Sequence, residues 1–385
     1  MKTRRVRVHF FNPWARALED IGVYLDNIPH LDLSEWVERP DDADLLQRAR
    51  LDCDWHGECA RCFSSLVYHG VEFLPARILG VEGLLNLAQV SQSNSGGEEW
   101  WLCLMAQHPQ KFAKIAGSLF ALLRQRGVRI LYYAFDEASR SMQCFESIAP
   151  HLDILIHDEY PICPIIHSRL RIGCQTVHRS WMANLVPFSV HFNERPEPSI
   201  LFLGSQLGLT AHRRKQIEFL RYEFKDRFIA YTNHSVSVAD RLALGRYKVG
   251  WSPEGRMFTT QAMSRSHTDR PFWSGCLGMV PLSENSRAGD RLEELSQAGL
   301  IERYEHGDLQ SLRIACERAL EWTVEQRRQV YEHFNRCQTV GSLVAQLISD
   351  FVFEGGVQRG EGMRAANLSI THKFQTSKIQ KILKN

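Results

Sequence analysis

The stretch Tyr247-Lys-Val-Gly-Trp-Ser-Pro-Glu-Gly-Arg256, with its continuation Arg270-Pro-Phe-Trp-Ser-Gly-Cys-Leu-Gly-Met-Val-Pro-Leu282, decides the expected fold. It reads as a short buried strand, a polar loop, a helix that begins with an arginine, and a second strand that begins at Met279. In α/β proteins, ligands bind at the loops that follow the carboxyl ends of parallel strands. Two such ends lie close together here and both carry polar side chains, so we expect the binding site at this edge.

The composition is typical of a folded protein with two domains. The chain has 385 residues, of which 44% are hydrophobic and 23% are charged, and its net charge is +2. No apolar run is long enough to predict a membrane span, and the first residues lack the apolar region of a signal peptide. The ten cysteines are scattered rather than grouped as a disulfide framework. We therefore expect a cytoplasmic protein without a membrane span.

Hydrophobic patterns predict alternating helices and strands, which indicate parallel, doubly wound sheets of the α/β class. The predicted strands are Val6–Phe11, Val128–Phe135, Leu152–Ile156, Ser199–Leu203, Phe228–Tyr231, Lys248–Trp251 and Met279–Leu282, and the predicted helices are 107–126, 139–148, 211–224 and a helix capped by Asp308. Three prolines and little periodicity place a linker at 186–198. We predict domains at 1–190 and 195–345, then a tail at 346–385 whose return to the first domain stays open.

The unit that begins at Gly204 has the features of a phosphate site. A glycine lets the backbone approach a ligand, and the amino end of the following helix offers free N–H groups. His212, Arg213, Arg214 and Lys215 lie in the first turn of that helix, where cations are unfavourable unless they face solvent or an anion. The sequence therefore allows two interpretations of these basic residues, a diphosphate site or a solvated basic patch.

Two residues of the opening stretch have the chemistry of ligand binding. Glu254 lies between Pro253 and Gly255 just after a strand, where a carboxylate can accept hydrogen bonds from ligand hydroxyls. Arg270 precedes Pro271 at the expected start of a helix, and an arginine there can hold a phosphate with two hydrogen bonds. Pairing of Arg270 with a nearby carboxylate is the structural alternative.

The order of these motifs resembles the donor-binding half of GT-B glycosyltransferases, in particular the exostosin-like and spore-coat-type branches. The matching positions are Gly204-Ser205, Arg213, Lys248 before Trp251-Ser-Pro-Glu-Gly255, and Arg270-x3-Ser274-x3-Gly278-x2-Pro281. The resemblance covers residues 199–325 and extends more weakly to 128–160. It implies two Rossmann-like domains facing a cleft, with a nucleotide-sugar donor bound by Gly204, Arg213, Arg214, Lys248, Ser252, Glu254, Arg270 and Ser274.

The resemblance implies metal-independent transfer of a sugar to an acceptor hydroxyl, and no cofactor besides the donor. Protein cations would stabilise the departing diphosphate, and the chain has no Asp-x-Asp metal motif. The candidate bases, at the ends of two strands, are Asp136, Glu137, His157, Asp158 and Glu159. Each of them is equally suited to a helix cap or a surface charge. The chain departs from many relatives at Trp273, where they place a glutamate that holds the ribose.

A cysteine-rich segment carries a second, weaker signal. Cys53, His56, Cys59 and Cys62 follow one another at steps of three, like a zinc set of three cysteines and one histidine. One tight segment that supplies all four ligands is strained, and small buried side chains are the preferred interpretation. Similarly, Trp100-Trp101 fits core packing better than an exposed aromatic platform for an acceptor.

Two further functions remain open. The chain could keep the fold as a binding protein without catalysis, which Trp273 favours, or it could glycosylate modified bases of nucleic acid, which the basic chain ends allow. The acceptor class therefore spans glycans, proteins, small molecules and modified nucleic acids. The sugar, the nucleotide and the stereochemical outcome are not fixed by the sequence.

Overall fold

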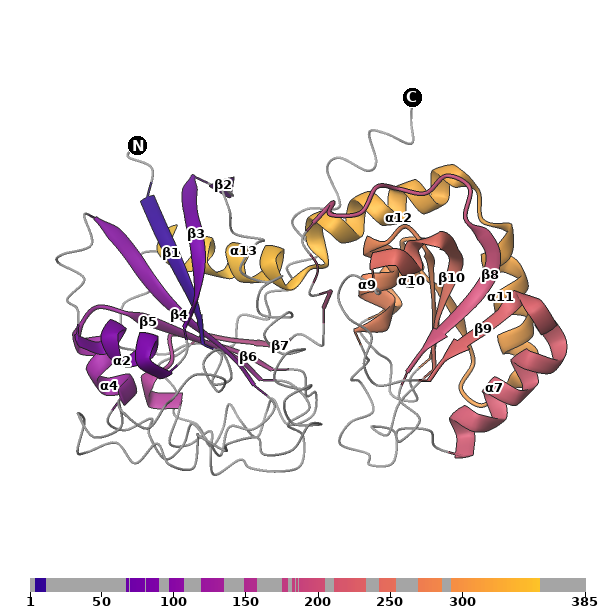
Figure 1. Cartoon of the computed structure of the whole chain (residues 1–385), viewed down its shortest axis with the longest axis horizontal. Helices are drawn as coiled ribbons and strands as arrows, with labels where there is room; N and C mark the ends of the chain where they lie inside the picture. Colours follow the sequence, from indigo (N-terminus) through magenta and orange to yellow (C-terminus); the bar gives the residue numbers. More distant parts are fainter. Residues whose placement is uncertain are drawn as a thin grey trace. The chain divides into compact units, whose positions relative to one another are not determined.

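The residues that the structure describes form two β-sheets (Figure 1). The structure, a computed structural model, describes residues 4–11, 67–68, 70–79, 81–89, 97–106, 119–134, 149–157, 175–178, 182–183, 185, 187–204, 211–232, 242–253, 269–285 and 292–353. The candidate residues Cys53, His56, Cys59, Cys62, Asp136, Glu137, Asp158 and Glu254 lie outside these ranges. None of the helices within these ranges is long and apolar enough to cross a membrane.

The first sheet has seven strands in the order β2-β3-β1-β4-β5-β6-β7. Its strands are β1 (Arg4–Phe11), β2 (Val67–Tyr68), β3 (Val71–Leu79), β4 (Glu98–Ala106), β5 (Arg129–Ala134), β6 (Ile154–His157) and β7 (Gln175–His178). All neighbouring pairs are parallel except β2 and β3, which are antiparallel. The predicted strands at β1, β5 and β6 are confirmed.

Two long strands of this sheet were not among the predictions. β3 and β4 lie on either side of β1, so they are central to the sheet. Trp101 lies in β4 and is fully buried, which confirms core packing for this tryptophan. The described helices near this sheet are α2 (Val81–Gln89) and the short α4 (Ala121–Gln125), which falls within the helix predicted at 107–126. Gly127, with a φ of 86°, ends α4 as expected.

The second sheet has five strands, all parallel, in the order β12-β11-β10-β8-β9. They are β8 (Glu197–Leu203), β9 (Phe228–Tyr231), β10 (Tyr247–Ser252), β11 (Val280–Glu284) and β12 (Glu302–Tyr304). Four of the five match predicted strands within a few residues, and only β12 was missed. All five residues of β11 are buried, as is usual for a strand covered on both faces.

Helices cover both faces of the second sheet (Figure 1). The helices of this part are α7 (Ala211–Phe224), α9 (Arg270–Cys276), α10 (Leu292–Gln297), α11 (Leu309–Glu321) and α12 (Val324–Cys337). The last described helix, α13 (Val340–Phe353), instead contacts β2 of the first sheet, where Ser349 Oγ donates a hydrogen bond to the Tyr68 carbonyl oxygen. α9 lies on one face of the sheet, and α7 and α11 lie on the other. The predictions of α7, of a helix beginning at Arg270 and of the Asp308 cap are confirmed. The architecture is therefore α/β with two mainly parallel sheets.

The core of the second sheet is aromatic at its centre. Trp251 in β10 is almost fully buried, and its ring centroid lies 5.2 Å from that of Phe202 and 5.8 Å from that of Phe228. Large aromatic side chains contribute most of the apolar area that a small core buries. These contacts hold β8, β9 and β10 together, and they fix the strand ends that carry the candidate site.

A buried arginine fixes the segment that precedes the second sheet. The guanidinium of Arg327 in α12 donates hydrogen bonds of 3.0 Å to the carbonyl oxygens of Asn193, Glu194 and Gly278. Only 1% of Arg327 is exposed. Residues 187–196, part of the predicted linker, form neither helix nor strand, so their carbonyl groups need such partners.

Candidate functional site

The carboxyl ends of the second sheet's strands bring several polar residues to one edge. β8 ends at Leu203, β10 at Ser252 and β11 at Glu284, and the strands run parallel in register. Polar groups after these strands therefore lie at the same edge, which is where α/β proteins bind ligands. α7 and α9 run back from this edge, so each presents its amino end there.

Arg270 is fixed at this edge by its own contacts. Its Nε donates a hydrogen bond of 2.6 Å to the carbonyl oxygen of Leu203, the last residue of β8. Its guanidinium carbon lies 5.8 Å from the centroid of the Phe202 ring. Arg270 is the first residue of α9, and Pro271 follows it in the first turn. The structure thus joins the start of α9 to the end of β8, which are far apart in the sequence.

Two other residues predicted to bind the donor, Gly204 and Ser274, are constrained by close packing. Gly204 donates its N–H to the carbonyl oxygen of Tyr231, and an added Cβ would lie 2.5 Å from the ring of Phe202. Ser274 is buried, and an added Cβ at Gly250 would lie 2.1 Å from its Oγ. The packing of neighbouring elements alone therefore requires small residues at these positions.

The cations predicted near the donor lie in different environments. Arg213, in the first turn of α7, is only 4% exposed, whereas Arg214 beside it is exposed. Lys248 lies near the amino end of β10, where its Nζ donates a hydrogen bond of 2.6 Å to the carbonyl oxygen of Leu320. Burial lowers the pKa of Lys248, and the positive charges of Arg327 and Arg227 lower it further. The structure thus does not bring Lys248 to the edge that carries Arg270.

For three further residues named in the sequence analysis, Ser252, His157 and Trp273, the structure gives only a position or a degree of burial. Ser252 ends β10, is 3% exposed and lies opposite Ser283 of β11. His157 is the last residue of β6 in the other sheet, so its backbone is at a strand end as predicted. Trp273 is 3% exposed and belongs to the hydrophobic core, so this side chain is a packing residue.

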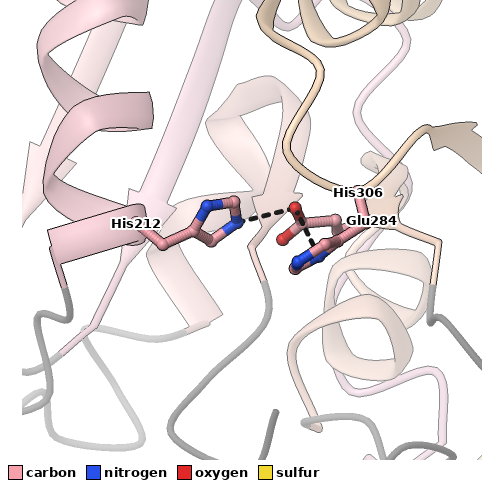
Figure 2. A group of neighbouring side chains, drawn as sticks. All are labelled: His212, Glu284 and His306. Carbon is pink, nitrogen blue, oxygen red and sulfur yellow. Dashed lines mark hydrogen bonds and ion pairs between the residues drawn. The ribbon is translucent and has the colours of Figure 1, made fainter. Parts of the chain in front are cut away.

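A cluster that the sequence did not reveal lies at the ends of β11 and β12. The Oε1 atom of Glu284 is 2.8 Å from Nε2 of His212 and 3.0 Å from Nδ1 of His306. Figure 2 shows both imidazoles beside this carboxylate, with dashed lines for a hydrogen bond to His212 and a close contact with His306. The ring centroids of the histidines are 4.8 Å apart. Three separate elements thus place two imidazoles and one carboxylate together.

Neutral donors also surround the same carboxylate oxygen. Gln216 Nε2 and the Gly307 N–H donate hydrogen bonds of 3.0 Å and 3.1 Å to Glu284 Oε1. Gly307 has a φ of 77°, a conformation that favours glycine and turns the chain between β12 and α11. Glu284 has an exposed fraction of 0%. Removing a carboxylate from water costs free energy, and hydrogen bonds from these donors offset that cost.

A chain of buried hydrogen bonds supports this arrangement from inside the core. Trp251 Nε1 donates to Tyr304 Oη at 3.1 Å, and Tyr304 Oη donates to Gln216 Oε1 at 3.5 Å. Gln216 then donates to Glu284, its neighbour in the cluster. The orientation of the Gln216 amide is thereby fixed, because its oxygen accepts while its nitrogen donates.

Sequence reasoning included His212 only as part of a basic turn, and it missed Gln216, Glu284 and His306. Glu284 and His306 each follow a strand, so a polar residue after a strand was the available signal. His306 was hidden because the three-residue strand β12 was not predicted.

Comparisons with known proteins add a set of solved structures with related architecture. No protein-family model matches the chain, and no curated protein sequence matches it. The structure titled lipopolysaccharide outer core galactosyltransferase WaaB, apo form, has a TM-score of 0.42 and 9% identity, covering 91% of this chain and 99% of that chain. AviGT4, a glycosyltransferase involved in avilamycin A biosynthesis, has a TM-score of 0.41 and 8% identity, covering 72% and 91%.

A structure from Medicago truncatula gives a weaker match. Medicago truncatula UGT71G1, complexed with UDP-glucose, has a TM-score of 0.32 and 10% identity, covering 72% of this chain and 85% of that chain. Because all these TM-scores lie below 0.5, the functional argument rests on the residues of this chain and not on these similarities.

Proposed function

We propose that this chain transfers a sugar from a nucleotide-sugar donor to an acceptor hydroxyl, without a metal ion on the donor diphosphate. Residues 195–345 would bind the donor and residues 1–190 the acceptor, with the two domains facing a cleft. The observation that carries the proposal is the position of Arg270. Its hydrogen bond to the Leu203 carbonyl holds a guanidinium at the carboxyl edge of the second sheet, beside the end of β8.

The chemistry of this edge suits a departing diphosphate. In glycosyl transfer the bond to the diphosphate breaks, and negative charge accumulates on the leaving oxygen. Cations and helix amino ends fixed in advance stabilise that charge without reorganising. Arg270 supplies a cation, and α7, a helix of 14 residues, presents its amino end at the same edge with Arg213 and Arg214 in its first turn.

The proposal retains some predicted donor residues and omits others. Ser252 ends β10 and Glu254 comes two positions later in the sequence, so they remain candidates for contacts with the nucleotide or the sugar. Lys248 is omitted because it lies at the opposite end of β10. Gly204 and Ser274 are retained only for their close packing, Gly204 against the Phe202 ring and Ser274 against Gly250.

A base on the acceptor side completes the proposed mechanism. It would accept the proton of the acceptor hydroxyl as that oxygen attacks the anomeric carbon. The candidates, which follow the strands β5 and β6 or end one of them, are Asp136, Glu137, His157, Asp158 and Glu159. Substituting the true base by an amide should abolish transfer and leave donor binding unchanged, which separates it from the other four.

Donor binding can be tested directly with the full chain. Thermal unfolding is measured with UDP-, GDP-, ADP- and CMP-linked sugars, because a ligand that binds the folded state raises its apparent stability. For the nucleotide sugar that stabilises the protein, Arg270→Ala should weaken binding roughly 10- to 100-fold, the loss expected for hydrogen bonds to a charged group. Arg221→Ala, an exposed arginine in the last turn of α7, is the matched control. Equal affinities of the wild type and Arg270→Ala would refute the donor site.

Trp273 supports a second candidate, a binding protein that has lost catalysis. This tryptophan occupies the position where many similar glycosyltransferases have a glutamate for the ribose, and it is packed in the core. Such a protein would bind a nucleotide or a glycan and release no sugar. Nucleotide binding that depends on Arg270, with neither donor hydrolysis nor transfer, would favour this candidate over the enzyme.

A further inference from the structure

We propose that His212, Glu284 and His306 form a binding site for a transition-metal ion of the zinc type. The three donor atoms, two imidazole nitrogens and one carboxylate oxygen, lie within 4.8 Å of one another. They come from the start of α7, the end of β11 and the turn after β12. This inference is independent of the proposed glycosyl transfer, in which the leaving diphosphate is stabilised by protein cations.

The ligand types select the class of metal. Imidazole nitrogen binds zinc, copper, nickel and cobalt well, whereas magnesium and calcium prefer sites made of oxygen ligands. Two histidines and one glutamate also match the three protein ligands of open zinc sites, in which water or another ligand takes the fourth position.

The geometry requires only small side-chain movements. Ligand atoms around a tetrahedral zinc ion, each about 2.0–2.2 Å from the metal, lie about 3.4 Å from one another. The two nitrogen–oxygen distances here are 2.8 Å and 3.0 Å, so each must widen by about half an ångström. The imidazole nitrogens must come no more than about 1.4 Å closer, since all three donor atoms lie within 4.8 Å. Rotation of the His212 side chain, which is 32% exposed, can supply this.

The surroundings of Glu284 favour a bound cation. Its carboxylate is fully buried, and Gln216 and the Gly307 N–H hold it in place. Metal ligands are typically oriented by such outer partners, whose loss weakens metal binding about 10- to 100-fold. The chain of hydrogen bonds from Trp251 through Tyr304 to Gln216 extends this support into the core.

Solvent access differs between the ligands in a way that suits ion entry. The side chains of His212 and His306 are 32% and 18% exposed, whereas the carboxylate beneath them is not exposed. An ion can therefore reach the site from solvent through the two imidazoles. Each neutral imidazole binds the metal through the nitrogen that faces Glu284, and its proton then resides on the other ring nitrogen.

The rival interpretation is a purely structural hydrogen-bonded pair of His212 and Glu284. The neutral His212 would donate its N–H to Glu284, His306 would pack beside the same oxygen, and no ion would bind. In the full chain stripped with a chelator, the metal site predicts one Zn²⁺ per chain, measured by titration calorimetry and elemental analysis, and a higher unfolding temperature with Zn²⁺. Absence of stoichiometric binding would overturn the proposal in favour of the hydrogen-bonded pair.

Variants assign the ion to these residues. His212→Gln and His306→Gln should each weaken Zn²⁺ binding by about 100-fold or more, beyond the loss typical of an outer partner. His191→Gln, at an exposed histidine outside the cluster, is the matched control and should bind Zn²⁺ like the wild type. Both test residues are partly exposed, so the folding of their variants is checked by unfolding in the chelator. Unchanged affinity in both variants would overturn the proposal.

Cobalt distinguishes this site from the cysteine-rich segment. Co²⁺ bound by thiolates gives strong near-ultraviolet charge-transfer absorption, whereas Co²⁺ bound by imidazole and carboxylate gives only the weaker visible bands. We expect visible bands that disappear in His306→Gln. Loss of a thiolate band in that variant, or thiolate absorption alone in the wild type, would place the ion on cysteines and overturn the assignment.

Discussion

The two ends of the five-stranded sheet use charged side chains in different ways. At the amino end, Arg327 and Lys248 donate hydrogen bonds to main-chain carbonyl oxygens, which are fixed parts of the fold. At the carboxyl end, Glu284 lies among two histidines, and Arg270, which also donates to a main-chain carbonyl, is only half-buried at the end of β8, unlike the fully buried Arg327. Imidazole, carboxylate and guanidinium groups can all exchange such contacts for a ligand. Charge at the amino end thus stabilises the fold, and charge at the carboxyl end is suited to function.

The strongest test of this contrast is Arg327→Met. The change leaves the carbonyl oxygens of Asn193, Glu194 and Gly278 without their charged donor. We expect the free energy of unfolding to fall by about 3–4 kcal/mol, because each buried unpaired acceptor costs about 1–3 kcal/mol. Chemical denaturation measures the loss. Arg328→Met, at the exposed neighbour, is the control and should change stability by less than about 0.5 kcal/mol. Similar losses in both variants would contradict the role of Arg327.

An intermediate effect is expected from Tyr304→Phe. This change removes the hydroxyl that accepts from Trp251 Nε1 and donates to Gln216 Oε1. The free energy of unfolding should fall by about 1–2 kcal/mol, since a buried indole N–H loses its acceptor. Tyr222→Phe, at a tyrosine that is 76% exposed, is the control and should leave stability unchanged. If the two variants are equally stable, the hydrogen-bond chain does not support the carboxyl end.

A smaller effect is expected from Lys248→Met. The variant loses the hydrogen bond to the Leu320 carbonyl and keeps most of the side chain's apolar length, so stability should fall by about 1 kcal/mol. Donor affinity should stay within about twofold of the wild type, because Lys248 is at the amino end of β10. Both quantities come from unfolding and calorimetry on the same variant. A tenfold loss of donor affinity would restore Lys248 to the donor site and remove the contrast.

The smallest effect concerns pH and the helix that also carries Arg327. Burial lowers the pKa of His333, so between its folded pKa and the ordinary value near 6.5 the unfolded chain binds more protons. Protonation of His333 in the unfolded chain therefore lowers the free energy of unfolding as the pH falls through about 6.5. In His333→Gln, the loss of unfolding free energy from pH 7 to pH 5 should be smaller than in the wild type. His191→Gln is the exposed control. A steeper loss in His333→Gln would contradict the sign of this shift.

The parts of the fold set by local patterns were predictable. The strands β8, β10 and β11 have continuous buried runs, and β9 is a run of four apolar residues. Asp308 and Pro271 mark helix starts by local chemistry. β3 was missed because charged positions such as Glu72 and Arg77 interrupt its apolar residues. β4 was missed although Trp100–Ala106 is a continuous apolar run, because Trp100-Trp101 was assigned to core packing followed by a loop. β12 was missed because three residues give no measurable period.

The cluster around Glu284 could not be predicted because its members meet only through the strand order. His212 and Glu284 are 72 residues apart, and they meet because α7 returns over a sheet in which β8, β10 and β11 are neighbours. A sequence pattern gives strand ends but does not give the order of strands across a sheet. The environment of Lys248 shows the same limit, since a cation near a ligand loop in sequence lies at the other end of its strand.

The contact between Gly250 and Ser274 also sets how this protein can be altered. An added Cβ at Gly250 would lie 2.1 Å from the Ser274 Oγ, so helix α9 approaches β10 as closely as two small residues permit. Arg270 is on the same helix, one turn earlier. A larger side chain at either position would displace the guanidinium without touching it. These two positions should therefore vary together or not at all, and a mutant library that aims to change the preferred donor should leave both unchanged.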